Sequence, residues 1–94
     1  MTSVGRVERA IKRTEGFNVR IRHLAGPDVR SDRTGMPPWP FERAAKDAWS
    51  VSDWKRRRFA PTYPGFMVDV LDAAREVAAG QTRLENVRAT YAKR

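Results

Sequence analysis

The middle of the chain holds a stretch with no regular hydrophobic period. Residues 25–40 contain two of the six glycines and four of the six prolines. Proline fixes φ and lacks a backbone N–H, and glycine weakens both helices and strands, so neither element can run through this stretch. We therefore expect a long loop, with the core built from the segments on either side of it. Ninety-four residues suffice for one modest core, so residues 1–94 are expected to form a single small basic domain.

The segment before the loop combines a helical pattern with a strand pattern. Residues 1–15 are expected to form an N-terminal helix with its apolar side chains on one side, which Thr2 or Ser3 can cap and Gly16 can end. Such a terminal helix of low apolar content can fray until a partner binds. Residues 17–23 alternate strictly between apolar and polar side chains, which predicts a half-buried strand with Arg20 and Arg22 on its outer face.

The segment after the loop predicts a short helical hairpin. Its first helix begins at Pro40 and repeats apolar residues at helical spacing up to Trp49. Its second helix runs from Val51 to about Phe59, where the Pro-rich turn 60–65 ends it.

The C-terminal third predicts a strand, a turn and a helix. Residues 66–71 carry apolar side chains on both faces, which is typical of a buried strand. Residues 72–77 can turn back as a β-hairpin, and a helix over 73–79 is the alternative. Thr82 and Glu85 have the spacing of a capping box that starts a last helix. The expected fold is α+β, with a small antiparallel sheet of two to three strands, N- and C-terminal helices and the central helical hairpin.

The stretch 43–57 resembles a helix-turn-helix. Its points of similarity are the paired alanines Ala44 and Ala45, the Ser-Val-Ser turn and the basic second helix. It departs from the motif at Trp49, near where such motifs usually carry glycine. A helix pair followed by the predicted β-hairpin also fits a winged helix-turn-helix, which is the form we expect if DNA is the ligand.

Charge is the strongest functional indication. Nineteen Lys and Arg stand against eleven Asp and Glu, giving a formal net charge of +8. A polyanion can offset this self-repulsion, although a GC-rich genome also yields many arginines. We predict that the chain binds nucleic acid, DNA rather than RNA, as a regulator or accessory factor. The residues expected to contact phosphates are Lys55, Arg56, Arg57, Arg58, Arg6, Arg9, Arg13, Arg20 and Arg22.

Two other functions stay open at this point. The first is an adaptor or inhibitor of the kind found in phages or plasmids, which docks on an acidic surface of a partner enzyme. In that case Trp39 is either a lid on the core or an exposed anchor for the partner. The second is a small ribonuclease that needs no metal and uses His23, Tyr63 and Arg58, although their spacing does not favour it, and we expect no enzyme.

The cysteine content, the apolar runs and the acidic residues bear on where the protein is located and on what it can bind. There is no cysteine, which fits a reducing, cytoplasmic environment, and no apolar run is long enough to cross a membrane. Asp28 and Asp32 lack a third carboxylate nearby, so we interpret them as turn residues and expect neither a metal nor a cofactor. The basic run at residues 55–58 has an equally plain alternative interpretation as a solvated helix face.

Overall fold

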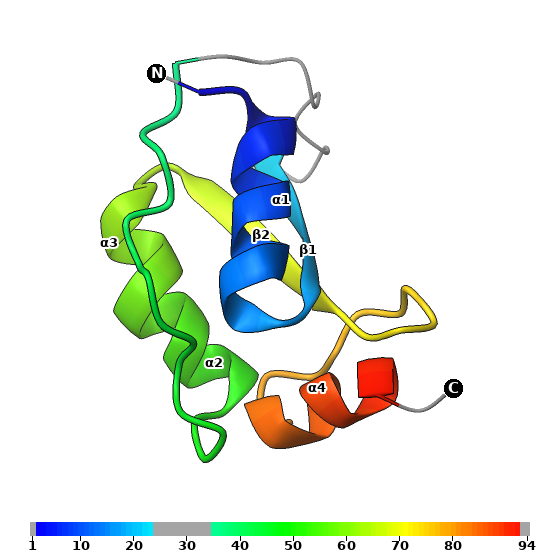
Figure 1. The fold of residues 1–94 in the computed structure, drawn as a ribbon. Coiled ribbons are helices and arrows are strands. Elements are labelled where there is room, and N and C mark those ends of the chain that lie inside the picture. Colours follow the sequence, from blue (N-terminus) through cyan, green and yellow to red (C-terminus); the bar gives the residue numbers. More distant parts are fainter. Residues whose placement is uncertain (1, 24–34, 93–94) are drawn as a thin grey trace.

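The structure, a computed structural model, describes residues 2–23 and 35–92. The predicted α+β class is confirmed: helices surround a two-stranded antiparallel sheet (Figure 1). The predicted loop of residues 25–40, with Asp28 and Asp32, falls largely outside the described residues. In chain order the elements are α1 (Val4–Glu15), β1 (Asn18–His23), α2 (Val51–Trp54), the π-helical η1 (Lys55–Phe59), α3 (Ala60–Thr62), β2 (Phe66–Leu71) and α4 (Leu84–Ala92).

Helix α1 forms as its end signals predict. The Ser3 hydroxyl accepts a hydrogen bond from the backbone N–H of Arg6 at 3.3 Å. Gly16 ends the helix at φ 87°, a left-handed conformation that glycine adopts without a Cβ penalty, and its N–H donates to the Lys12 carbonyl. The apolar side of α1 is buried against β1, and its opposite side carries the arginines.

The sheet pairs β1 with β2 in an antiparallel register that runs from Asn18 opposite Leu71 to His23 opposite Phe66. The alternation in β1 is confirmed, because Val19 and Ile21 are buried. After β2 the chain turns back, as predicted, but the return makes only one bridge, between residues 71 and 77. The turn of the predicted hairpin is therefore present, but its second strand is not. The alternative helix over 73–79 does not form either.

Elements α2, η1 and α3 form one continuous helical run beside the sheet (Figure 1). Ser50 and Asp53 begin it with a capping box. The run passes the end predicted at Phe59 and reaches Thr62. It widens at η1, where the Ala60 N–H donates to a carbonyl five residues earlier, and Pro61 follows at the first positions of α3.

The predicted helix from Pro40 to Trp49 is absent. Residues 37–49 run instead as an irregular strap in front of α2 and α3 (Figure 1). Tertiary hydrogen bonds replace helical ones here, since the Ala45 N–H donates to the Glu15 carboxylate and the Arg43 carbonyl accepts from Arg58. Without a first helix there is no helix-turn-helix in the described chain, and the winged-helix expectation fails with it.

Helix α4 docks on this strap. The predicted capping box at Thr82 does not form, because the N–H of Glu85 donates to the Asp47 carbonyl at 3.1 Å. The N–H of Leu84 similarly donates to the Trp49 carbonyl at 2.8 Å. The strap therefore supplies the acceptors that a capping side chain would otherwise provide.

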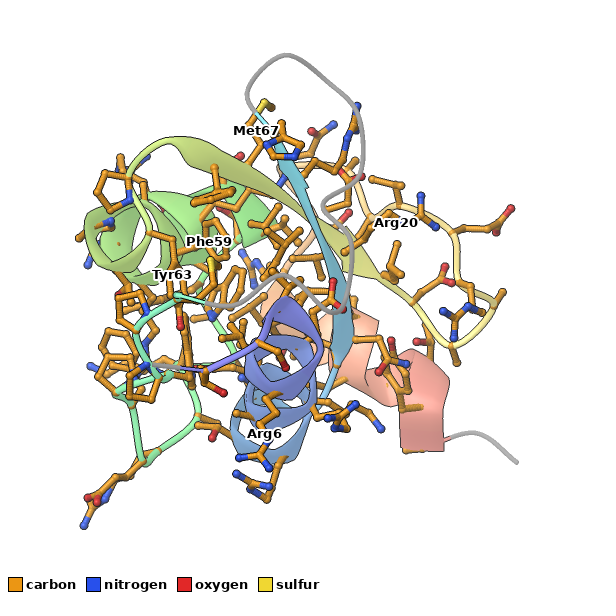
Figure 2. The ribbon with its side chains drawn as sticks, turned by 90° about the horizontal axis from the view of Figure 1, so that it is seen from above. Arg6, Arg20, Phe59, Tyr63 and Met67 are labelled. Atoms are coloured by element: carbon orange, nitrogen blue, oxygen red, sulfur yellow. The ribbon has the colours of Figure 1, made fainter. Side chains whose placement is uncertain are left out.

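An aromatic cluster fills the core between the strap and the helical run. Trp39 lies 5.7 Å from Trp54 and 6.1 Å from Tyr63, measured between ring centres. Phe59 and Tyr63 point from the helical run toward the strap (Figure 2). Trp39 is only 8% exposed, so it is the lid on the core and not an exposed anchor. The docking hypothesis loses the side chain on which it depended.

The buried Tyr63 hydroxyl makes stability depend on alkaline pH. It donates to the Pro37 carbonyl at 2.8 Å, and burial raises the pKa of Tyr63 from 10.0 to about 12. Because the folded pKa exceeds the unfolded one, this contribution is complete below pH 10.0 and is lost as the pH rises toward about 12.

We expect the free energy of unfolding to fall over this alkaline range and to fall less steeply in Tyr63→Phe. Urea titrations at a series of pH values give the free energy of unfolding of the wild type and of the variant, and so the dependence of each on pH. Burial also raises the pKa of Tyr91, so the Tyr63→Phe variant removes only part of the decline. If the free energy of unfolding of wild type and of Tyr63→Phe depends on pH in the same way, the buried Tyr63 hydroxyl does not cause the decline.

Candidate anion-binding site

The predicted basic cluster on η1 does not present its charges together. Lys55 is half-buried, whereas Arg56 is exposed and donates to the Asp53 carboxylate at 2.8 Å. The Arg57 guanidinium lies 5.1 Å from the centre of the Trp49 ring. The cluster is thus divided among separate local contacts.

Arg58 turns inward and belongs to the folded core, not to the binding surface that the sequence predicts. Its side chain is 14% exposed and donates to the Glu15 carboxylate at 2.5 Å. It also donates to the Arg43 carbonyl at 2.7 Å and lies 4.3 Å from the centre of the Phe41 ring. A phosphate could reach this guanidinium only by displacing those partners.

Glu15 is the centre of a buried ionic network. Its side chain has no exposed surface and accepts from Arg58 and from the Ala45 N–H, the latter at 2.8 Å. Arg88 Nη2 lies 3.5 Å from the same carboxylate, and Arg88 Nη1 donates to Asp47 at 2.6 Å. Arg58 and Arg88 therefore join α1, the strap, the helical run and α4, and both are already committed to the fold.

The two arginines on the outer face of β1 are also engaged. Arg22 Nη1 lies 3.1 Å from the Asp69 carboxylate, with the arginine side chain 34% exposed. Arg20 stands opposite Asp69 in the sheet register, is half-buried and makes interactions of its own. Figure 2 shows Arg20 on the side of β1 near the connection that follows β2.

The arginines of α1, unlike those of β1 and η1, are all exposed and lie along one side of their helix. Arg6, Arg9 and Arg13 are all exposed, and their spacing of three and then four residues aligns them in one stripe along the helix. Within residues 2–23 and 35–92, none of the three guanidinium groups has a carboxylate partner. Figure 2 shows Arg6 pointing away from the sheet and the core. We call these three residues the α1 stripe.

The α1 stripe borders a groove of about 530 Å³ between α1 and the beginning of the strap. Three cations thus stand along one side of the groove, and apolar side chains form much of the remaining wall. The residues that line the groove are Thr2, Arg6, Val7, Arg9, Ala10, Arg13, Pro38 and Trp39.

Hydrogen bonds hold the far wall of the groove in place. Thr2 and Met36 exchange two backbone hydrogen bonds, at 2.9 and 3.1 Å. The next carbonyl, that of Pro37, accepts from the Tyr63 hydroxyl. The groove is therefore built by the fold, and its cations need not reorganise the backbone to meet an anion.

The three residues considered for a ribonuclease have separate surroundings. His23 lies at the end of β1, with its ring 6.0 Å from that of Phe66. Tyr63 is buried, with its hydroxyl donating to the Pro37 carbonyl, and Arg58 donates to the Glu15 carboxylate. Their contacts give no shared position at which a substrate could meet all three.

Comparison with known proteins gives no further guide. No protein-family model matches the chain, and neither a curated protein nor a solved structure does. In the part of the chain that the structure describes, no helix is both long and apolar enough to span a bilayer. The same residues bring no three His, Cys, Asp or Glu side chains together in a way that could hold a metal ion.

Proposed function

We propose that the protein binds nucleic acid by its phosphate backbone, and that the α1 stripe makes the primary contacts. The observation that carries the proposal is the exposure of three aligned, unneutralised arginines beside a preformed groove. Arginine donates in a rigid fork that suits phosphate oxygens, and here no internal carboxylate competes for it in the described chain.

The geometry of the stripe fits a regular polyanion. Seven residues of α-helix separate its ends, a rise of about 10 Å at 1.5 Å per residue. One strand of a duplex advances about 3.4 Å per phosphate, so this length corresponds to roughly three phosphates. The absence of a helix-turn-helix removes the reason to favour DNA, and the proposal therefore concerns phosphate contacts common to DNA and RNA.

Binding should weaken steeply with salt. Each phosphate contact contributes about −0.9 to the slope of log affinity against log salt, so three contacts give about −2.7. Affinity for a fluorescein-labelled DNA duplex of about 20 base pairs should then fall about 40-fold between about 50 and 200 mM salt. Fluorescence anisotropy measures it, with an RNA duplex of equal length in parallel. Absence of binding at the lower salt, or a flat dependence, contradicts the proposal.

Removing the stripe should remove most of this binding. In Arg6→Ala/Arg9→Ala/Arg13→Ala we expect affinity to fall at least tenfold at low salt and the magnitude of the salt slope to fall by about 2.7. The fold should persist, since exposed unpaired cations add little to stability.

A matched control separates this site from net charge. Arg43→Ala/Lys46→Ala/Arg83→Ala also removes three positive charges, but from exposed positions away from the groove. This variant should keep the wild-type slope and lose little affinity. If both triple variants weaken binding equally, only general charge attracts the nucleic acid, and the stripe is not a site.

A further inference from the structure

A second hollow lies beside the α1 helix and also collects cations. It has a volume of about 300 Å³, and Arg9, Lys12 and Arg75 line it together with Asn18 and Val19. The first two come from α1, whereas Arg75 comes from the turn after β2, far along the chain. Arg9 lines both hollows and therefore connects the two cationic groups.

Arg75 adopts a backbone conformation that is unusual for its residue type. Its φ is 64°, the one positive value found for a non-glycine residue in the described chain. Glycine or asparagine occupies this region at lower cost, so a turn alone does not call for arginine. Strain of this kind is found more often at functional positions.

The turn that carries Arg75 is held firmly. The Asp72 carboxylate accepts from the N–H groups of Ala74 and Glu76, at 2.8 and 3.0 Å. The Ala73 N–H donates to the Thr90 hydroxyl of α4 at 3.0 Å. The position from which Arg75 extends is thus set by hydrogen bonds on both sides, and its side chain has no ion-pair partner among residues 2–23 and 35–92.

One acidic residue also lines this hollow. Glu8 is directed toward the sheet, where its carboxylate accepts the Ile21 N–H at 3.0 Å. Lys12 is placed by the Tyr91 ring, whose centre lies 5.1 Å from its Nζ. Three cations against one carboxylate that is already hydrogen-bonded leave a net positive hollow.

We propose that the bound nucleic acid extends over both hollows, and that one further phosphate is bound in the second hollow by Lys12 and Arg75. This inference rests on the proposed function and extends it, because it widens the contact surface from the α1 stripe to the turn after β2. It also assigns a phosphate contact to a turn residue outside every basic cluster of the sequence.

The deciding variant is Arg75→Gly, which removes the cation and suits the positive φ. We expect an unchanged or higher urea midpoint, an affinity about fivefold lower for the same labelled duplex at low salt, and a salt slope reduced by about 1. Arg75→Lys keeps the charge and should retain most of the slope. Arg83→Ala, a loss of charge elsewhere on the surface, should leave the slope unchanged.

The outcomes distinguish this inference from the function on which it rests. If the wild type binds and the stripe variant does not, but Arg75→Gly keeps the wild-type affinity and slope, then the phosphate contact in the second hollow is wrong and the stripe stands alone. If the wild type fails to bind either duplex, both proposals are wrong. A lower affinity of Arg75→Gly with an unchanged slope would also overturn the phosphate contact.

Discussion

Replacing Glu15 by alanine is expected to lower the free energy of unfolding by about 3–5 kcal/mol, because it leaves two largely buried guanidinium groups without their shared carboxylate. The same change removes the acceptor of the Ala45 N–H. A small domain has a total stability of about 5–15 kcal/mol, so the variant should be barely folded at room temperature.

Urea denaturation followed by circular dichroism measures the loss, and two further variants define its cause. Glu42→Ala removes the same charge from an exposed position and should change stability by less than about 0.5 kcal/mol. Replacing Glu15, Arg58 and Arg88 together by methionine should recover much of the loss, since no buried charge then remains unpaired. A Glu15→Ala variant within about 1 kcal/mol of wild type would show that the network is not a stabilising centre.

Replacing Trp54 by alanine is expected to cost about 3–5 kcal/mol. The indole is completely buried, with its ring centre 5.2 Å from Phe17 and 6.2 Å from Phe59, so alanine leaves a large cavity. Trp39→Ala should cost less, because Trp39 lies at the edge of the cluster and one side of it lines the groove.

Equilibrium denaturation of both alanine variants shows which of them loses more free energy of unfolding. Trp54→Phe serves as the conservative control. Trp54 Nε1 has no hydrogen-bond partner in the described chain, so phenylalanine loses volume but no hydrogen bond. Its cost should therefore lie well below that of Trp54→Ala. If Trp39→Ala proves the more damaging of the two alanine variants, the strap stabilises the fold more than the centre of the aromatic cluster does.

Elements whose signals are local could be predicted from the sequence. Helix α1 carries its own cap and its own stop, and β1 carries a strict alternation that only a strand satisfies. The strand at 66–71 and the turn after it likewise follow from neighbouring residues. The α1 stripe was also visible as the polar side of a helix, because helical spacing alone aligns its three arginines.

The errors arise where distant residues decide the structure. Helical spacing in residues 40–49 suggested a helix, but the Glu15 carboxylate and Arg58 bind the backbone of this segment and hold it as a strap. The same carboxylate, 43 positions from Arg58 in sequence, withdraws that arginine from the surface. Neither effect leaves a local pattern, and the positive φ of Arg75 is likewise not visible in the sequence.

The pairing of β1 with β2 has a consequence for how the chain reaches this structure. Roughly 40 residues separate the two strands, so closing the loop between them costs about 3 kcal/mol of chain entropy before any sheet hydrogen bond forms. Strand pairs this distant in sequence raise the contact order, and high contact order slows folding relative to helical proteins of equal size. For a domain of this size we expect the sheet, strap and aromatic cluster to form in one cooperative transition, so that the basic groove forms together with them.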